Sequence, residues 1–464
     1  LDAAARTSVK GDPNLQDVGG IPVDLNQGTF QLFHDLTLDG SGGASELSIP
    51  GLVYDSSTVD ARPVIQAVVN RGAGEPVPLT VTATLNWFDF PNNQGENIKT
   101  TVTYIIDPDE TNSLFDSQYT FDIQPDSIPM VTGVYSWELE LVFHFDDNPD
   151  ETQKKPDLIM HSAGSVPVIV NETVRQSDFK GGSKVIQPVT YQFGNGWSLA
   201  GVPTLYIDDH GDNGGNSTKD DLLILKFPGE SAKVFRPLNS SGRYNYGTVG
   251  FESVDVYSQF TPATTGPPGS GEPNVVSSTI KDAGEFGTLT ADNDTNYIYY
   301  TDESGTVYTF TRYKVNKGTS DEYSLFLITS IEAPASKPLL FNRDASGKIL
   351  SITATDGTVL DLGFAKGSSL ITSISGTGTP EVKFTYNGVN LESIQYISNT
   401  LSATSATPLT NQDRIRKFEY NAAGNLVKDQ WFSQVHTGNT PVNVSQLSNP
   451  SKITNFYYTT TFSV

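Results

Sequence analysis

The chain has 464 residues, with 29 basic and 53 acidic side chains, a formal net charge of −24 and no cysteine. This charge repels nucleic acid and anionic lipid, which argues against a nucleic-acid partner. The absence of Cys excludes disulfides and thiolate chemistry, and it fits both a bacterial exported protein that does not rely on disulfides and a cytosolic protein.

Residues 1–62 predict an extended arm followed by an opening hairpin. Residues 1–20 are polar and contain Gly, Asp, Asn and Pro. Strand patterns at 23–34 and 47–56 flank a Gly/Ser cluster at 40–43 that supplies the turn. No signal-peptide pattern and no apolar stretch long enough to span a membrane is present, so no membrane insertion is expected. Because the chain opens with Leu1 and ends on a strand pattern, we expect a fragment of a longer protein.

Residues 63–190 change to strict alternation. At 79–87 and 137–145, apolar residues alternate with Thr, Asn, Glu, Val or His. A period of two places one face in a core and the other in water. Six candidate strands, at 64–70, 79–88, 97–106, 117–124, 134–145 and 164–171, predict a β-sandwich that resembles an immunoglobulin-type domain.

Residues 191–330 return to hairpins. Strand patterns at 222–227 and 232–235 flank the turn Pro228-Gly229, and patterns at 297–301 and 306–310 flank a second turn. Between them, the segment 261–278 contains Gly-Pro-Pro-Gly-Ser-Gly and is expected to be a surface loop.

Residues 331–464 carry a repeat. In each copy an aromatic residue ends one strand, a turn of Asn, Asp, Gly or Ser follows, and an apolar strand leaves the turn; the copies start at Phe341, Phe364, Tyr386 and Tyr420. The spacings are 21, 22 and 20 residues between Ile331, Ile352, Ile374 and Ile394. Such a period predicts small hairpins that must stack on their neighbours to bury their apolar faces.

The copy at 420–426, Tyr-Asn-x-x-Gly-Asn-Leu, resembles the YD repeats of the RHS (rearrangement hot spot) family. Three further segments resemble other parts of that family: Val23-Asp-Leu-x-x-Gly-x-Phe with Leu52-Val-Tyr-Asp-Ser56, the step Phe193-Gly-Asn-Gly-Trp-Ser-Leu199, and Gly305-Thr-Val-Tyr-Thr-Phe310. The residues that match the family motifs are Tyr54, Gly194, Gly196, Trp197, Tyr386, Tyr420 and Gly424.

The resemblance implies a β-sheet spiral that builds a hollow shell, as in toxin carriers and large bacterial surface proteins. The predicted fold class is all-β, with an immunoglobulin-like β-sandwich (63–190) inserted into an RHS/YD-type β-hairpin repeat sheet. The opening hairpin (1–62) precedes the insertion, and the hairpins of 191–330 and the repeats of 331–464 follow it. The family's core-ending motif with autoproteolytic aspartates is absent, so a toxin could only lie downstream of this chain.

Two groups of residues are candidate sites. Oxygen ligands suit calcium, and an acidic cluster invites that interpretation: Asp208, Asp209, Asp212, Asp220 and Asp221. Its spacing does not match Asp-x-Asp-x-Asp-Gly, so a solvated hairpin turn is the alternative, and no other cofactor is expected. Asn-x-Ser/Thr sequons, which accept glycans in a secretory pathway that glycosylates, occur at Asn171, Asn216, Asn239, Asn293 and Asn443.

No nucleophile elbow, phosphate-binding loop or paired-histidine motif occurs, so no enzyme is expected. The sequence predicts an extracellular or cell-surface structural protein of a bacterium, a scaffold or a subunit of a surface layer or filament. Unpaired strand edges at 1–36 and 453–464 would pair with another copy or with other surface proteins. The alternatives are an adhesin whose sandwich binds a glycan, and part of an RHS shell that carries a C-terminal passenger outside this chain.

Overall fold

The prediction of an all-β fold is confirmed. A computed structural model describes residues 2–6, 15–17, 22–24, 29–34, 51–70, 77–91, 97–106, 118–125, 132–145, 156–169, 192–207, 222–229, 232–237, 250–254, 258–259, 261–262, 287–291, 297–315, 323–376, 381–397, 411–436 and 447–456. Within these ranges every regular element is a β-strand, apart from a single 3-10 turn, η1 (Ser56–Thr58).

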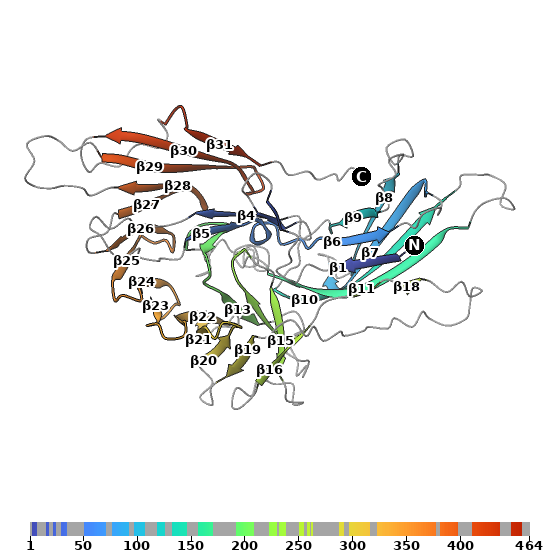
Figure 1. The fold of residues 1–464 in the computed structure, drawn as a ribbon, viewed down its shortest axis with the longest axis horizontal. Coiled ribbons are helices and arrows are strands. Elements are labelled where there is room, and N and C mark those ends of the chain that lie inside the picture. The colour runs from blue at the N-terminus through green and yellow to red at the C-terminus, as the bar shows by residue number, and fades with distance from the viewer. Residues whose placement is uncertain are drawn as a thin grey trace, which may run out of the picture.

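The alternating segment forms two sheets that face each other at the right of Figure 1. All six strands expected there are present: β6 (Ile65–Asn70), β7 (Thr80–Pro91), β8 (Asn97–Ile105), β9 (Gln118–Ile123), β10 (Gly133–His144) and β11 (Leu158–Val168). Their inward side chains form one core, in which Trp87, Trp137 and Phe121 are fully buried. The polar residues between them face outward, as the alternation requires.

Three strands from outside 63–190 complete this sandwich. They are β1 (Asp2–Arg6), β17 (Ser258–Gln259) and β18 (Thr261–Pro262). β1 pairs with β6 on one edge and with β17 on the other, while β18 pairs with β11. The expectation of an extended arm at the N-terminus is therefore wrong for residues 2–6, because these residues fill a gap in a sheet.

The largest sheet has 17 strands and begins with a closed ring. The ring runs through β13 (Thr204–Ile207), β14 (Leu223–Lys226), β15 (Lys233–Pro237), β16 (Gly250–Val254), β19 (Thr288–Ala291), β20 (Tyr297–Thr301), β21 (Val307–Val315) and β22 (Tyr323–Glu332). β13 closes it by pairing with β22 as well as with β14. Eight strands enclose only enough space for side chains, and Phe235, Tyr300, Phe310 and Phe326 occupy it. This part of the sheet is packed and not hollow.

The sheet continues past the ring because β22 carries two neighbours on one edge. Phe326 and Leu327 pair with β13, whereas Ser330 and Ile331 pair with β23. The following strands are β23 (Leu339–Arg343), β24 (Ile349–Thr353), β25 (Val359–Phe364), β26 (Ile371–Gly376), β27 (Glu381–Asn387), β28 (Asn390–Ile397), β29 (Asn411–Tyr420), β30 (Leu426–His436) and β31 (Lys452–Asn455). The hairpins of 191–330 and the repeats of 331–464 thus share one continuous spiral sheet.

A third unit lies inside this spiral. Its strands are β12 (Trp197–Leu199), β5 (Leu52–Asp55), β4 (Thr29–His34), β3 (Pro22–Asp24) and β2 (Leu15–Asp17), in that order across the sheet. Figure 1 shows β4 and β5 between the ring below and β27–β31 above. Leu52, Tyr54 and Trp197 share one core cluster with the inner faces of the ring and the repeats.

Two of the repeat hairpins, and the earlier hairpin at 302–306, turn through the same five-residue geometry. In Asp302–Thr306, Asp344–Lys348 and Asn421–Asn425, the first residue's side-chain oxygen accepts two backbone N–H groups at 2.9–3.0 Å. The glycine at the fourth position has a φ of +82°, +89° or +86°, a region that favours Gly. The pattern Asp/Asn-x-x-Gly recurs because this turn needs an acceptor first and a left-handed residue fourth.

Each repeat hairpin also carries a β-bulge near the end of its first strand. The residue after the bulge pairs with the first apolar residue of the next strand: Arg343 with Ile349, Phe364 with Ile371, Tyr386 with Leu391, and Tyr420 with Leu426. The sequence alignment that placed Phe341 in this series is therefore wrong by two residues. Phe341 instead corresponds to Phe384 and Phe418, and Arg343 takes the place of the aromatic residue.

Candidate functional site

The motif residues expected from sequence gather along a segment inside the spiral, residues 192–199, which we call the central segment. The Trp197 ring lies 5.5 Å from the Tyr54 ring and 4.7 Å from the Phe418 ring, between centroids. Its indole Nε1 donates a hydrogen bond to the Tyr420 hydroxyl at 2.9 Å. Trp197 and Tyr54 are fully buried, so this aromatic group joins the opening hairpin to the last repeat.

The glycines of the motif allow the backbones to approach. A Cβ on Gly196 would lie 2.5 Å from the Tyr54 ring, and one on Gly194 would lie 2.9 Å from the carbonyl oxygen of Val389. Both residues also have positive φ, +80° and +97°. Glycine is required here by close contact and by conformation together.

The central segment binds the repeats in succession through hydrogen bonds. Gln192 Oε1 accepts from the Ile349 N–H at 3.0 Å, and the Gln192 carbonyl accepts from the Ile371 N–H at 2.8 Å. Asn195 N–H then donates to the carbonyl of Val389 at 2.9 Å. In the last hairpin, the Leu426 N–H donates to the Tyr54 hydroxyl at 3.0 Å. The bulges and turns leave these backbone groups outside the strand ladder, and the central segment and Tyr54 satisfy them hairpin by hairpin.

The repeat tyrosines connect each hairpin to the one before it. The Tyr386 hydroxyl donates to the Ile371 carbonyl, and the Tyr420 hydroxyl donates to the Leu391 carbonyl, both at 2.7 Å. Burial raises the pKa of both phenols well above the ordinary value of 10.0, so they remain protonated donors. The tyrosines therefore serve structure and are not placed as acids or bases.

Arg343 makes the corresponding contacts in the first repeat. Its guanidinium donates to the Ile328 carbonyl on β22 at 2.9 Å and to the Gly347 carbonyl at 2.6 Å. Burial lowers the pKa of Arg343 to about 10, which still leaves it charged at neutral pH. A cation at this place ties the first repeat to the strand that closes the ring.

A buried ion pair anchors the opening hairpin to the ring. Asp55 on β5 accepts from Lys226 Nζ on β14 at 2.9 Å and from the Gly229 N–H at 3.2 Å. Its other oxygen caps η1 by accepting from the Ser57 N–H at 3.0 Å. Burial by itself raises the pKa of Asp55, but the Lys226 ammonium and the Ser57 hydrogen bonds outweigh it and lower the pKa. Asp55 is therefore an ionised structural link.

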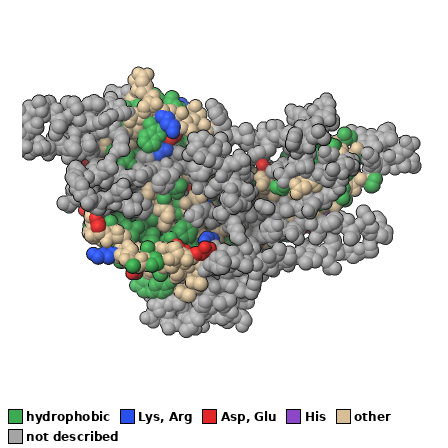
Figure 2. Space-filling model, viewed as in Figure 1, with side chains coloured by type: hydrophobic (Ala, Val, Ile, Leu, Met, Phe, Trp, Pro, Cys, Tyr) green, Lys and Arg blue, Asp and Glu red, His purple; other side chains and the backbone are tan. Residues whose placement is uncertain are grey.

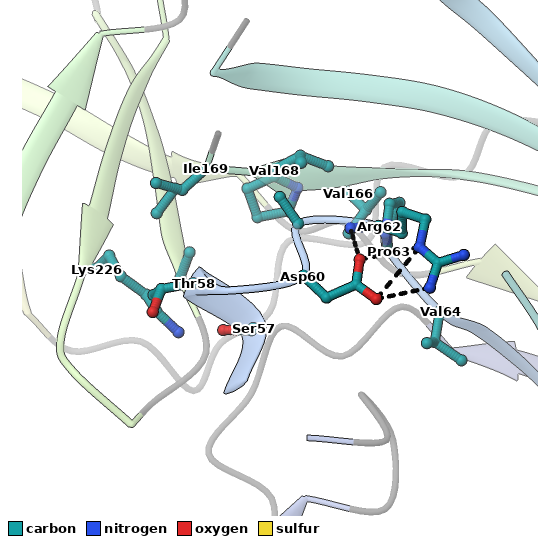
Figure 3. A pocket seen from close by; sticks show the side chains of 13 residues that line it. Ser57, Thr58, Asp60, Arg62, Pro63, Val64, Val166, Val168, Ile169 and Lys226 are labelled. Carbon is teal, nitrogen blue, oxygen red and sulfur yellow. Dashed lines mark hydrogen bonds and ion pairs between the residues drawn. The ribbon is translucent and has the colours of Figure 1, made fainter. Parts of the chain in front are cut away.

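A cleft lies where the sandwich meets the spiral (Figure 3). It is lined by η1 and the residues after it, by β11, and by Lys226 and Ala232. In Figure 3, Arg62 and Asp60 are joined along one wall, with Nη2 and Oδ2 2.7 Å apart. Both cations of the lining, Arg62 and Lys226, are thus paired with carboxylates. The volume, about 70 Å³, is far below the ~300–1,000 Å³ of small-molecule sites, so the cleft is a junction.

Next to this cleft the two parts pack through a small apolar cluster. Val134 of β10 lies buried against Ile224 of β14, Val234 of β15, and Ala232 just before β15. Ile169 packs against this cluster. This contact places the sandwich directly against the ring.

The other expected sites lie outside the described residues. These are the acidic cluster Asp208, Asp209, Asp212, Asp220 and Asp221, and the sequons Asn171, Asn216, Asn239, Asn293 and Asn443. Within the described part of the chain, no group of three or more His, Asp or Glu side chains is placed to hold a metal ion. In the same part, no helix is long and apolar enough to cross a membrane.

The strand edges differ from expectation at the N-terminal end. β1, β3 and β4 are each paired on both edges, so the prediction of free edges over 1–36 is wrong for them. At the other end, β31 pairs with β30, and no described strand pairs with its second edge.

Several residues that matter here were not among the candidate residues selected from sequence. Gln192, Asn195, Asp55 and Lys226 act through contacts that span long stretches of chain. The only available signal was their position beside matched motifs, since Gln192 precedes Phe-Gly-Asn-Gly-Trp, Asn195 lies within it, and Asp55 follows Tyr54. No protein-family model matches the chain, and a search of curated proteins finds no match either.

Proposed function

We propose that this chain is a non-enzymatic structural protein related to the RHS/YD-repeat family, working at the surface of a bacterium or outside it. Its role is that of a scaffold that extends by strand pairing. The observation that carries the proposal is the edge of β22, which is shared by β13 and β23. A sheet built in this way has one closed beginning and one advancing end. The immunoglobulin-like character of the sandwich belongs to the same proposal, supported by its two packed antiparallel sheets.

The advancing end is β31, and its geometry suits a further strand. The Phe456 N–H donates to the Val427 carbonyl, so Phe456 occupies a hydrogen-bonded position of the pairing with β30. Thr454, two residues earlier in β31, lies opposite Asp429 and occupies the next such position. Antiparallel pairing alternates between bonded and non-bonded positions, so Asn455 directs its N–H and C=O away from β30. Ile453 has the same orientation, and its side chain is 52% exposed.

Charge complementarity favours a second copy of this chain as the partner. The chain carries a net charge of −24, but basic side chains gather at the top of Figure 2, over β30 and β31. Lys452 lies on β31, whereas Lys428 on β30 is paired with Glu419 Oε2 at 2.7 Å. A positive side chain such as Lys452 at the edge of an acidic protein attracts the acidic surface of its own copies.

The test compares two substitutions at the outward position. Asn455→Pro removes the outward N–H and leaves the bonds to β30 intact, whereas Asn455→Ala keeps the N–H. We expect the unchanged chain and Asn455→Ala to form oligomers as concentration rises, measured by light scattering after size exclusion and by electron microscopy. Asn455→Pro should remain monomeric with an unchanged unfolding midpoint.

Two outcomes would contradict the proposal. One is a monomer at every concentration for the unchanged chain. The other is equal assembly of Asn455→Pro and Asn455→Ala, which would show that β31 is not the contact.

A further inference from the structure

Three side-chain amide oxygens are buried beside the central segment without a hydrogen-bond partner: Oδ1 of Asn195, Asn390 and Asn425. They come from three separate parts of the chain. Each oxygen is shielded from solvent, although the residues themselves are only partly buried. Buried polar atoms are almost always satisfied in folded proteins, so three together require an explanation.

Two of these residues, Asn195 and Asn390, reach the space beside Gly424, which Cγ1 of Val59 also lines. The amide nitrogen of Asn195 lies 3.1 Å, and the amide oxygen of Asn390 lies 4.0 Å, from the place where a Cβ on Gly424 would stand. Asn425 is the next residue along the chain. A side chain at Gly424 would fill this space, and Gly424 has a φ of +86°.

Two of the three asparagines occupy the same position in successive hairpins. Asn390 precedes Leu391, and Asn425 precedes Leu426, the residues that pair with Tyr386 and Tyr420. The equivalent residues in the first two hairpins are Lys348 and Leu370. The asparagines therefore occur only in the hairpins that meet Asn195.

In the first hairpin, the residue equivalent to Asn390 and Asn425 is Lys348, and its side chain contacts the next hairpin. The Lys348 ammonium lies 3.4 Å from the centre of the Phe364 ring in the next hairpin, and it also donates to the Ser368 carbonyl at 3.5 Å. A positive charge is thus already placed between hairpins at the equivalent point of the repeat. In the third and fourth hairpins, asparagine replaces the lysine.

The number of acceptors distinguishes the possible occupants. A water molecule has two hydrogens and can satisfy two of the three oxygens, whereas a cation attracts all three at once. The ligands are neutral, so they compensate poorly for the dehydration of a divalent ion. Rings of neutral carbonyl oxygens replace the hydration shell of alkali cations in proteins.

We propose that an alkali-metal cation, Na⁺ or K⁺, binds among Asn195, Asn390 and Asn425 and locks the last two repeats to the central segment. A ligand that binds only the folded state raises its stability with concentration. The cation would thus make the rigidity of the spiral depend on its ionic surroundings.

The test measures the thermal unfolding midpoint of the full chain in chloride salts of equal ionic strength. We expect the midpoint to be at least ~2 °C higher in KCl or NaCl than in choline chloride, since choline screens charge but is too large to enter. Thallium(I), a K⁺ substitute with an anomalous signal, should appear at this place in crystals. Separate KCl, NaCl and CaCl₂ titrations identify the ion.

Matched variants locate the effect. Asn390→Leu should lose the difference between KCl and choline chloride, while Asn342→Ala on the outer face should retain it. Asn390→Lys places an ammonium where Lys348 has one, so it should unfold at the same temperature in both salts and above Asn390→Leu.

Equal midpoints for the unchanged chain in all chloride salts would overturn the proposal and leave an amide turned toward its neighbour, or a water, as the occupant. A response to CaCl₂ alone would overturn the assignment to an alkali ion. If Asn390→Leu fails to fold, thallium at the site supports the proposal and its absence there overturns it.

Discussion

The Trp197 indole and the Tyr420 hydroxyl are joined by a hydrogen bond of 2.9 Å across 223 positions of sequence. The same hydroxyl donates to the Leu391 carbonyl at 2.7 Å. One oxygen atom therefore connects the central segment, the third repeat and the fourth. Removing it leaves two buried polar groups without partners.

Tyr420→Phe is expected to reduce the free energy of unfolding by about 1–3 kcal/mol, the cost of orphaned buried groups. Tyr386→Phe is the matched control, because the Tyr386 hydroxyl makes the same bond to the preceding hairpin but receives none from Trp197. Its cost should be about 1 kcal/mol. Urea unfolding measures both, and equal losses would show that the Trp197 contact contributes nothing.

Gly196→Ala separates close contact from backbone conformation. Gly201 has a similar φ, +69°, but a Cβ there would meet no atom within 4 Å. We expect Gly201→Ala to cost about 1–2 kcal/mol for the left-handed conformation alone. Gly196→Ala should cost about 1–3 kcal/mol more, since its Cβ collides with Tyr54. Similar unfolding midpoints for the two variants would refute the close-contact argument.

The turn aspartates predict a dependence on pH. Burial alone raises the pKa of Asp344, but hydrogen bonds from Ser346 and Lys348 outweigh it and lower the pKa below the ordinary 3.8. A lowered folded-state pKa means that this stabilisation is complete above pH 3.8 and is lost as the pH falls through the folded-state value.

Asp344→Asn copies Asn421, which makes the same turn without a titrating group. The variant should match the unchanged chain at pH 7 and lose less stability between pH 4 and pH 2. Thermal unfolding across this range gives the comparison, and a change at the exposed Asp361 of β25, Asp361→Asn, controls for the loss of one charge. An unchanged pH profile in Asp344→Asn would contradict the argument.

The last hairpin replaces an apolar pair with a charged one. Arg416 and Asp429 are almost fully buried and form two 2.8 Å hydrogen bonds. The corresponding residues one hairpin earlier are Val382 and Ile394. Arg416→Leu should cost about 3–5 kcal/mol, because it leaves Asp429 buried and unpaired.

The double change Arg416→Leu with Asp429→Ile restores the apolar pattern. It should be neutral or stabilising by up to about 4 kcal/mol. Urea unfolding of the two variants decides the point. A double variant as unstable as Arg416→Leu would mean that the ion pair itself, and not the avoidance of an unpaired charge, holds the hairpin.

Most of the local structure could be predicted from the alternation of apolar and polar residues and from turn-forming residues. The six sandwich strands follow from apolar residues at every second position, and the turns at 302–306, 344–348 and 421–425 follow from Asp or Asn three residues before Gly. The motif residues Tyr54, Trp197 and Tyr420 could be selected from sequence through the resemblance to family motifs, and the structure holds all three in close mutual contacts.

The remaining features depend on partners distant in the chain. β1 is a short Ala-rich strand that could not be recognised in the sequence, because it is defined by its pairing with β6 and β17. The β-bulges shift the register, so Arg343 could not be recognised as the equivalent of Tyr386 by aligning aromatic residues. The closure of the ring rests on two residue pairs between β13 and β22, too few to leave a pattern in the sequence.

The shared edge of β22 also bears on how such a protein can evolve. A closed barrel has a set number of strands, and inserting two would force every neighbour to tilt anew. In the spiral, a duplicated hairpin adds to the advancing end while the ring stays unchanged. Length thus becomes a heritable variable that gene duplication can adjust without redesigning the core.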